Sequence, residues 1–296
     1  MKLSVIIVTY NSEKDIYDCL RSLYKYNDLP QDDLEVIVVD NQSRNYEAMR
    51  ACLGKDYPSV RVVQNTHNGG YGQGNNVGIR LSAAPNIAIM NPDVRLKMPM
   101  FKEMIMHLRE DNVAMCAGKQ LGGNGKVFAS FFSTFTTPWW IGRPLEFLSR
   151  QKLDKYFYKW QYLSGAFFFI RKELFEQIGL FDENIFLYAE ENDIHYRIRH
   201  TFPSMKMCYF NHLQYIHLAE GRQFSAKHVR QVYISNGYFF KKNGLSAKRY
   251  WKGQIRMNLM LDMFYRLRSF IRHSSYVDSC HAKERNYILH ELIKEN

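Results

Sequence analysis

The 296-residue sequence predicts an α/β fold, built on a mainly parallel β-sheet with helices on both faces. Two observations indicate this class. Apolar, β-branched runs alternate with amphipathic segments through the first hundred residues, which is the order of repeated βαβ units. The apolar runs are continuous and do not alternate with polar residues, as expected for strands that are covered on both faces.

The individual elements follow from these patterns. Ile16, Cys19 and Leu23 recur at helical spacing after the first apolar run, and polar residues stand where that helix needs a cap. Gly54 is expected to stop a later, short helix. The expected strands are 3–10, 34–43, 60–65 and 86–94, and the expected helices are 11–26, 46–56, 74–83, one from about 189 and others from 225. Residues 122–160, rich in glycine and aromatics, are interpreted as a long loop or lid.

The composition indicates an ample core and an anionic partner. Hydrophobic residues make up 46% of the chain, and the formal net charge is +11. This charge favours nucleic acid, an anionic membrane surface or a phosphate-bearing ligand, without choosing among them. The five scattered cysteines form no CxxC pair and are expected to be the reduced thiols of a cytosolic protein. Neither a signal peptide nor a transmembrane helix is predicted, so we expect a soluble or peripheral protein.

Polar side chains stand at the carboxyl ends of the predicted strands, where an open α/β sheet binds its ligands. They belong to Thr9, Tyr10, Asn11, Asp40, Asn41, the segment 65–70, Asn91 and Asp93. Asp40 suits a hydrogen bond from a base or ribose, or a turn cap. Asp93 suits a divalent cation, or a plain turn. The glycine-rich loop "NGGYGQGNNVGI" suits a phosphate at a helix N-terminus, although such loops often only turn the chain.

The stretch "IFLYAEENDIHYRI" sets carboxylates among large apolar side chains. Burying a carboxylate is costly unless it is paired, bound to metal or needed for chemistry, so this stretch predicts catalytic groups. The alternatives are a solvated helix face with arginine partners, or a metal pair formed by Glu191 and His195. Asp182, just upstream, is expected to be a turn or cap residue. His217 is either structural or a ligand.

Together, these motifs resemble glycosyltransferase family 2, and within it the rhamnosyltransferase-like bacterial members that build O-antigen, capsule or other surface glycans. The motifs, in order, are "SVIIVTYNSEKDIYDCLRSL", "EVIVVDNQS", "NGGYGQGNNVGI", "MNPDV", "LSGAFFFIRKELFEQIGLFDENIFLYAEENDIHYRIR" and His217. They span roughly residues 2–222. The resemblance implies a GT-A fold, a nucleotide-diphosphate-sugar donor, Mg²⁺ or Mn²⁺, and inversion at the anomeric carbon.

The resemblance also implies a role for each motif residue. Glu191 is the expected catalytic base, where the family usually has aspartate, and Glu190 and Asp193 are expected to position the acceptor or the helix. Asp93 is the expected metal ligand, with His217 completing the metal or diphosphate site. The expected nucleotide-binding residues are Thr9, Tyr10, Asn11, Asp40, Asn41, Gly70, Asn75, Asn76 and Asn91, the last standing where aspartate is usual.

The implied organisation is a catalytic domain, 1–224, followed by a helical extension, 225–296. The domain divides into a nucleotide-sugar-binding half, 1–96, and an acceptor half, 97–224. The implied partners are a nucleotide-diphosphate sugar and a glycan or lipid-linked glycan acceptor, without nucleic acid. Two alternatives stay open: a sugar nucleotidyltransferase, whose N-terminal signature is missing, and a basic nucleic-acid-binding protein, for which no motif is found.

The tail carries an apolar stripe beside basic residues. The stripe consists of Met260, Met263, Phe264, Leu267, Phe270 and Ile271. Between residues 241 and 272 a single acid, Asp262, stands against nine basic residues, namely Lys241, Lys242, Lys248, Arg249, Lys252, Arg256, Arg266, Arg268 and Arg272. This pattern favours an interfacial helix on an anionic membrane surface, which would place the protein at the inner face of the cytoplasmic membrane. The alternatives are packing on the catalytic domain and a homodimer contact.

Overall fold

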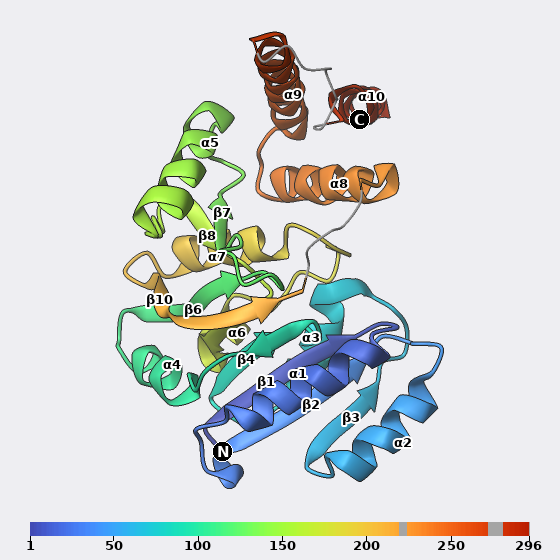
Figure 1. Cartoon of the computed structure of the whole chain (residues 1–296), viewed down its shortest axis with the longest axis vertical. Helices are drawn as coiled ribbons and strands as arrows, with labels where there is room; N and C mark the ends of the chain where they lie inside the picture. Colours follow the sequence, from blue (N-terminus) through green and yellow to red (C-terminus); the bar gives the residue numbers. More distant parts are fainter. Residues whose placement is uncertain (219–223, 272–280, 296) are drawn as a thin grey trace.

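The computed structural model describes residues 1–218, 224–271 and 281–295. Its centre is an eight-stranded sheet in the order β3-β2-β1-β4-β9-β6-β10-β5 (Figure 1), and a separate two-stranded sheet pairs β7 with β8. The strands are β1 Leu3–Thr9, β2 Leu34–Asp40, β3 Val60–Gln64, β4 Asn86–Met90, β5 Val94–Leu96, β6 Val113–Leu121, β7 Phe131–Ser133, β8 Gln161–Leu163, β9 Phe167–Arg171 and β10 Lys206–His217.

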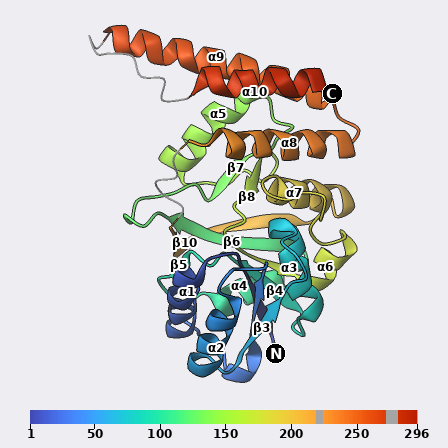
Figure 2. The same cartoon turned by 90° about the vertical axis from the view of Figure 1, so that its right-hand side faces the viewer.

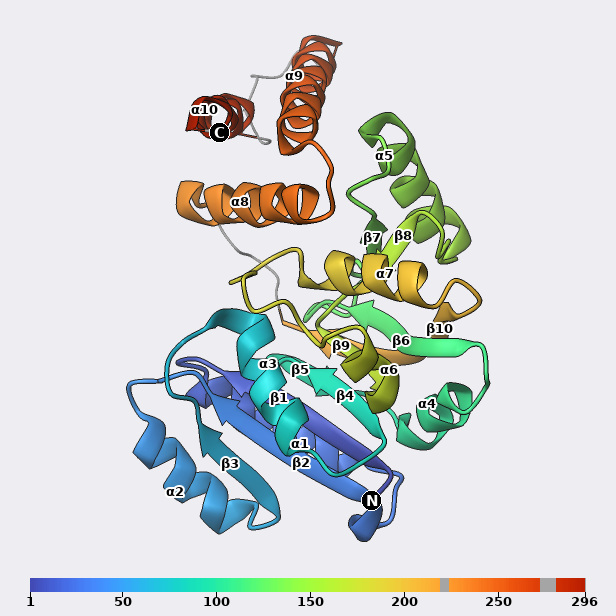
Figure 3. The same ribbon diagram turned by 180° about the vertical axis from the view of Figure 1, so that it is seen from behind.

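The helices lie on both faces of the sheet and at one end of the molecule. They are α1 Glu13–Lys25, the short η1 Gln31–Asp33, α2 Tyr46–Asp56, α3 Gly70–Leu81, α4 Phe101–Leu108, α5 Trp139–Phe147, η2 Leu148–Leu153, α6 Lys172–Gln177, α7 Glu190–Thr201, α8 Ala226–Lys242, α9 Ala247–Ile271 and α10 Ala282–Glu295. Figure 3, from behind, shows α3 and α6 over the face of the sheet opposite to α1.

The buried strand β1 explains the parallel half of the sheet. It pairs in parallel with β2, so that Thr9 lies opposite Asp40, and with β4 on its other side. An apolar core lies on each face of the sheet, and β1 contributes to both. Val5 and Ile7 pack on one face and Ile6 on the other. The continuous apolar run thus reflects burial from two sides, as predicted. Strand β9 is antiparallel to its two neighbours, β4 and β6, so the sheet is mixed.

Four details of the sequence-based assignment are wrong. Gly54 does not end its helix, because α2 continues to Asp56. Helix α3 begins at Gly70, four residues earlier than expected. The run 86–94 is two strands, β4 and β5, separated by the turn that carries Asp93. The region 122–160 is not one long loop, since it contains β7, α5 and η2. Strand β7 pairs with β8, and α5 packs on β7, η2 and α9.

The C-terminal extension is helical, as predicted, and forms a layer of its own. Helices α8, α9 and α10 share an apolar core around Trp251, Phe239 and Leu289. Figure 2 shows this layer at the end of the molecule opposite to the N-terminus, with α5 reaching toward it. Among the described helices, none combines the length and hydropathy needed to cross a bilayer. Arg272 of the predicted basic set lies outside the described residues.

Candidate active site

The ends of β1 and β2 form a polar corner. Asp40 is fully buried, and its carboxylate accepts hydrogen bonds from Thr9 Oγ1 at 3.0 Å and from the backbone N–H of Ser43 at 2.8 Å. Both oxygens therefore hold the turn after β2, which favours the turn-cap interpretation of Asp40. Tyr10 is 53% exposed beside this corner, and Asn11 follows it with a left-handed backbone at φ 51°.

The glycine-rich loop is fixed by amide side chains. Asn41 donates to the carbonyl of Gly70 at 2.9 Å and accepts from Asn65 at 2.9 Å, so the end of β2 is tied to the start of α3. Gly70 has φ +90°, and a Cβ there would stand 2.0 Å from the carbonyl oxygen of Phe186. Only glycine fits this position, because the loop presses its backbone against the segment that precedes α7.

Two asparagines of α3 are buried. Asn76 donates to the carbonyl of Phe181 at 2.9 Å and accepts from the Phe181 N–H at 3.0 Å, so it anchors the "GLFDE" segment. Asn75 donates to the carbonyl of Tyr71, and its buried Oδ1 has no hydrogen-bond partner among the described residues. An unpaired buried amide oxygen is costly and is suited to a ligand or water.

Asp93 and His217 come together at the end of β10. Val94 pairs with His217 across the β5–β10 ladder, and His217 Nε2 lies 3.2 Å from Asp93 Oδ1. His217 is buried, yet neither ring nitrogen has a hydrogen-bond partner within the described residues. A carboxylate beside an imidazole whose ring nitrogens make no hydrogen bond to the described residues suits a divalent cation. The two residues are in contact although 124 positions separate them, so no local sequence pattern predicts the contact.

The turn between β8 and β9 joins this corner to the carboxylates of α7. Glu191 Oε1 accepts a hydrogen bond from the Gly165 N–H at 3.1 Å, and Tyr71 donates to the Gly165 carbonyl at 2.7 Å. The next residue, Ala166, accepts from the Asn91 N–H at 2.8 Å. The Asn91–Asp93 turn and the carboxylate of Glu191 are thus held on the same two-residue support.

Glu190 and Glu191 begin helix α7 in a buried environment. Burial raises the pKa of both carboxyls, and the neighbouring Glu191 charge adds to the rise at Glu190. Backbone amides and the nearby His217 oppose the rise at Glu191. Glu190 Oε1 has no partner among the described residues. Burial therefore disfavours the ionised form of both carboxyls, and more strongly at Glu190 than at Glu191.

Asp193 lies one turn further and faces away from solvent. Its side chain has no exposed area, and its two oxygens lie 2.8 Å from Arg197 and 2.8 Å from Lys242 Nζ. Lys242, at the end of α8, also lies 2.7 Å from Asp182. The bonds from Lys242 and Asn184 outweigh the effect of partial burial and lower the pKa of Asp182 to about 2. Asp193 therefore holds helix α7 in place, and Asp182 combines the predicted turn role with an ion pair.

The backbone before α7 is strained and is held by the C-terminal extension. Tyr188 and Ala189 have φ of 67° and 113°, which is unfavourable for residues with a side chain. Helix α8 binds this segment: Ser235 donates to the Leu187 carbonyl at 2.6 Å, and Tyr188 Oη lies 2.7 Å from His228 Nδ1. No local sequence pattern predicts this contribution of α8, because the partners lie about 40 residues or more apart.

His195 is not placed beside Glu191 as a metal ligand. Its Nε2 lies 2.9 Å from the Tyr158 carbonyl, and burial lowers its pKa to about 3. A neutral imidazole that donates to a carbonyl is a structural histidine. This observation decides against the Glu191–His195 metal pair.

A groove of about 280 Å³ opens between β7, α5 and α9. The Phe135 N–H at its edge donates to Asn192 of α7 at 3.0 Å. Aromatic and polar side chains alternate along it, namely Phe132, Ser133, Thr134, Phe135, Thr137, Trp139, Arg143, Glu146, Arg150, Tyr162, Tyr250 and Gln254. Aromatic faces with nearby hydrogen-bonding groups suit a sugar ring.

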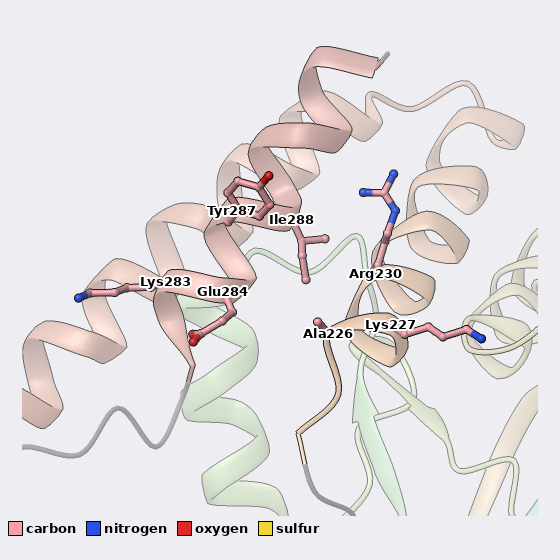
Figure 4. A pocket seen from close by; sticks show the side chains of 7 residues that line it. All are labelled: Ala226, Lys227, Arg230, Lys283, Glu284, Tyr287 and Ile288. Atoms are coloured by element: carbon pink, nitrogen blue, oxygen red, sulfur yellow. The ribbon is translucent and has the colours of Figure 1, made fainter.

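A larger hollow, of about 620 Å³, lies elsewhere, between α8 and α10. Figure 4 shows Arg230 and Ile288 on the two helices that border it, while the side chains of Lys227 and Lys283 extend outward from the space between them. None of the sequence-predicted site residues lines it. Size alone therefore does not identify the functional site of this chain.

Comparison with known proteins identifies the family and the fold. The sequence matches Glycosyl transferase family 2 over residues 4–179. The low-salt glycan biosynthesis hexosyltransferase Agl10 of Haloferax volcanii is 26% identical over 83% of this chain and 77% of its own length. The poly(ribitol-phosphate) β-N-acetylglucosaminyltransferase TarS of Staphylococcus aureus is 31% identical over 43% of this chain, but this covers only 22% of TarS.

Solved structures of glycosyltransferases show the same fold. A mannosyltransferase of Pyrobaculum calidifontis, in complex with GDP-Man and Mn²⁺, superposes with a TM-score of 0.60 at 17% identity, over 82% of this chain and 64% of that one. Residues 1–349 of S. aureus TarS, in complex with UDP, superpose with a TM-score of 0.55 at 17% identity, over 100% and 92% of the two chains. The predicted GT-A fold is confirmed.

Proposed function

Because the chain belongs to glycosyltransferase family 2, we propose that it transfers a sugar, with inversion, from a nucleotide-diphosphate donor to a glycan or lipid-linked glycan acceptor in bacterial surface polysaccharide synthesis. The observation that carries this proposal is the convergence of Asp93 and His217 with Glu190 and Glu191, which are linked through the Asn91 and Gly165 turns. A dTDP-rhamnose or UDP-hexose donor follows only from the resemblance.

The proposed metal is Mg²⁺ or Mn²⁺, held by Asp93 and His217. Within the described residues no group of three or more acidic, histidine or cysteine side chains is arranged to hold a metal. Two protein ligands are nevertheless sufficient for a cation that also binds diphosphate oxygens and water. Mn²⁺ complexes of structural neighbours support this assignment. When bound, the cation neutralises charge on the leaving diphosphate.

The proposed base is Glu191. Its side chain is half-buried, and the Gly165 N–H orients its carboxylate and so fixes the direction in which the remaining lone pairs point. It takes the proton of the acceptor hydroxyl while that oxygen attacks the anomeric carbon from the face opposite the diphosphate. Glu190, whose pKa burial raises further, is proposed to keep a proton and to donate a hydrogen bond to the acceptor.

The proposed nucleotide site uses the corner at the ends of β1, β2 and β4. Tyr10 is free to contact the base, since it is exposed beside Asn11. Thr9, Asp40 and Asn41 shape the corner through their mutual bonds and those to Ser43, Asn65 and the α3 loop. Gly70, Asn75, Asn76 and Asn91 complete the proposed set of nucleotide-binding residues. Most of these side chains act on the ligand through the backbone that they hold.

The acceptor is proposed to lie in the groove between α5 and α9, where Tyr162 and Phe135 approach α7. The enzyme is proposed to work in the cytoplasm, at the inner face of the membrane, where a lipid-linked acceptor would be presented. The alternative proposal for the C-terminal extension is a homodimer contact in place of a membrane contact.

A thermal-shift screen of nucleotide sugars with and without Mn²⁺ tests the donor proposal. A ligand at about 100 times its Kd stabilises the native state by about 2.7 kcal/mol, so the true donor raises the melting temperature only with the metal present. The control is Asp93→Asn, in which the metal-dependent part of the shift is expected to vanish. If no nucleoside diphosphate sugar or nucleoside diphosphate shifts the wild type, the proposal is wrong.

A further inference from the structure

Exposed apolar side chains are concentrated at one end of the molecule. Of the 22 large apolar side chains exposed among the described residues, twelve lie on the α5–η2 segment or on α9, which together comprise 40 residues. They are Trp140, Ile141, Phe147, Leu148 and Leu153 on the first segment, and Leu259, Met260, Met263, Phe264, Leu267, Phe270 and Ile271 on the second. We call these twelve side chains the apolar pole.

Two segments distant in sequence build this pole together. Figures 1 and 2 both place α5 and α9 at the end opposite to the N-terminus. The two helices touch, since a Cβ on Gly253 would lie 4.0 Å from Trp139 Cδ1. Trp140 is 62% exposed and Phe270 is 78% exposed. Monomeric soluble proteins rarely expose so many large apolar side chains in one region, so the pole has the character of an interaction surface.

The charge around the pole identifies the partner. The α5–η2 segment and α9 carry nine basic and two acidic side chains, a net charge of +7 out of the +11 of the whole chain. The two acids are neutralised locally: Glu146 by Arg150, and Asp262 by Arg266 at 2.8 Å. A second copy of the chain would bring a second +7 to the same interface, which opposes self-association. An anionic bilayer accommodates both the charge and the apolar side chains.

We propose that the α5–η2 segment and α9 form one surface that inserts its apolar side chains into an anionic lipid bilayer. The proposal rests on the proposed function only for its purpose, which is to bring the groove between the same helices to a lipid-linked acceptor. The groove is lined by Trp139 and Arg143 of α5 and by Tyr250 and Gln254 of α9. Its mouth is therefore framed by the helices that would lie on the membrane.

Vesicle co-sedimentation of the full chain tests the surface. Wild-type protein is expected to bind phosphatidylglycerol vesicles at low salt and to bind phosphatidylcholine vesicles weakly. Trp140→Glu on α5 and Phe264→Glu on α9 are each expected to lower the partition coefficient roughly tenfold or more, because each replaces inserted apolar area with a charge. Met106→Glu on α4 is the matched control, since Met106 is 56% exposed like Phe264 but lies at the sheet. It should bind like wild type.

Three outcomes overturn the proposal. Wild-type protein that ignores anionic vesicles at low salt rules out the membrane. Loss of binding in Phe264→Glu alone, with Trp140→Glu unchanged, rules out a surface built from both helices. A wild-type dimer in sedimentation velocity that both variants dissociate, without vesicle binding, assigns the pole to a second copy. Glu191→Gln keeps the two proposals apart. Its transfer activity tests the proposed base, whereas its vesicle binding should equal that of wild type whatever the role of Glu191.

Discussion

Lys242→Met tests whether the C-terminal extension positions the catalytic carboxylates. Lys242 Nζ is bonded to both Asp193 and Asp182, and Asp193 has no exposed area. Removing one partner of a buried pair costs about 3–5 kcal/mol when the other charge is left alone. Here Arg197 still pairs with Asp193 at 2.8 Å, and Asp182 borders solvent, so we expect about 2 kcal/mol.

Thermal and chemical unfolding measure this loss. For a chain of 296 residues, with an unfolding entropy of about 2.1 cal/mol/K per residue, 2 kcal/mol corresponds to a fall in melting temperature of roughly 3 °C. The matched control is Lys227→Met on the same helix, where the lysine is exposed and the charge change is identical. A double-mutant cycle of Lys242→Met with Asp193→Asn isolates the pair, and a coupling of about 1 kcal/mol or more is expected for groups in contact.

The kinetic readout separates positioning from simple stability. If α8 holds the start of α7, then Lys242→Met lowers kcat even when the assay temperature is well below the melting temperature of the variant. Its donor affinity stays close to wild type. The same fall in kcat is not expected for the Lys227→Met control. A Lys242→Met protein with both melting temperature and kcat equal to those of the control would refute the reasoning, and Asp193 would then need another role.

Three further predictions concern the site itself. Glu191→Gln should keep donor binding and lower transfer by roughly 10²–10⁴, and the wild-type rate should rise with pH through a pKa above the ordinary glutamate value, because burial raises the pKa of Glu191 and only its ionised form accepts the proton; turnover near wild type in the variant would contradict this role. Asp93→Asn should remove the Mn²⁺ enhancement of nucleoside diphosphate binding in calorimetry, with a smaller effect for His217→Ala, and an unchanged enhancement would remove Asp93 from the metal site. Gly70→Ala should lower stability by about 2 kcal/mol or more in denaturant unfolding, since its φ is +90° and the new Cβ would overlap the Phe186 carbonyl; a stability equal to wild type would mean that the loop relaxes freely.

The parallel half of the fold could be predicted from sequence because its signals are local. Strand β1 is a single apolar run whose burial on two faces is written in consecutive residues, and α1 shows its apolar face within four turns. The order β4-β9-β6-β10 could not be predicted in this way. Strand β9 pairs with two strands that precede it by about 50 and 80 residues, and such pairing depends on side-chain contacts that no short window contains.

The candidate site divides along the same line. The setting of large apolar residues in "IFLY" predicts burial of Glu190, and the structure buries it. The ion pair that gives Asp193 a structural role could not be predicted from sequence. Its partner, Lys242, belongs to a segment with no recognisable motif.

The extension is therefore more than an appendage for docking. Tyr188 and Ala189 stay in left-handed backbone only if the surrounding contacts outweigh a strain of about 1–3 kcal/mol per residue. Helix α8 supplies two contacts to this segment, from Ser235 to the backbone of residue 187 and from His228 to the Tyr188 hydroxyl. Helix α8 packs in turn on α9, which carries seven of the twelve side chains of the apolar pole. Packed groups thus lead from the proposed membrane surface through α8 to the start of α7, where the proposed catalytic carboxylates lie.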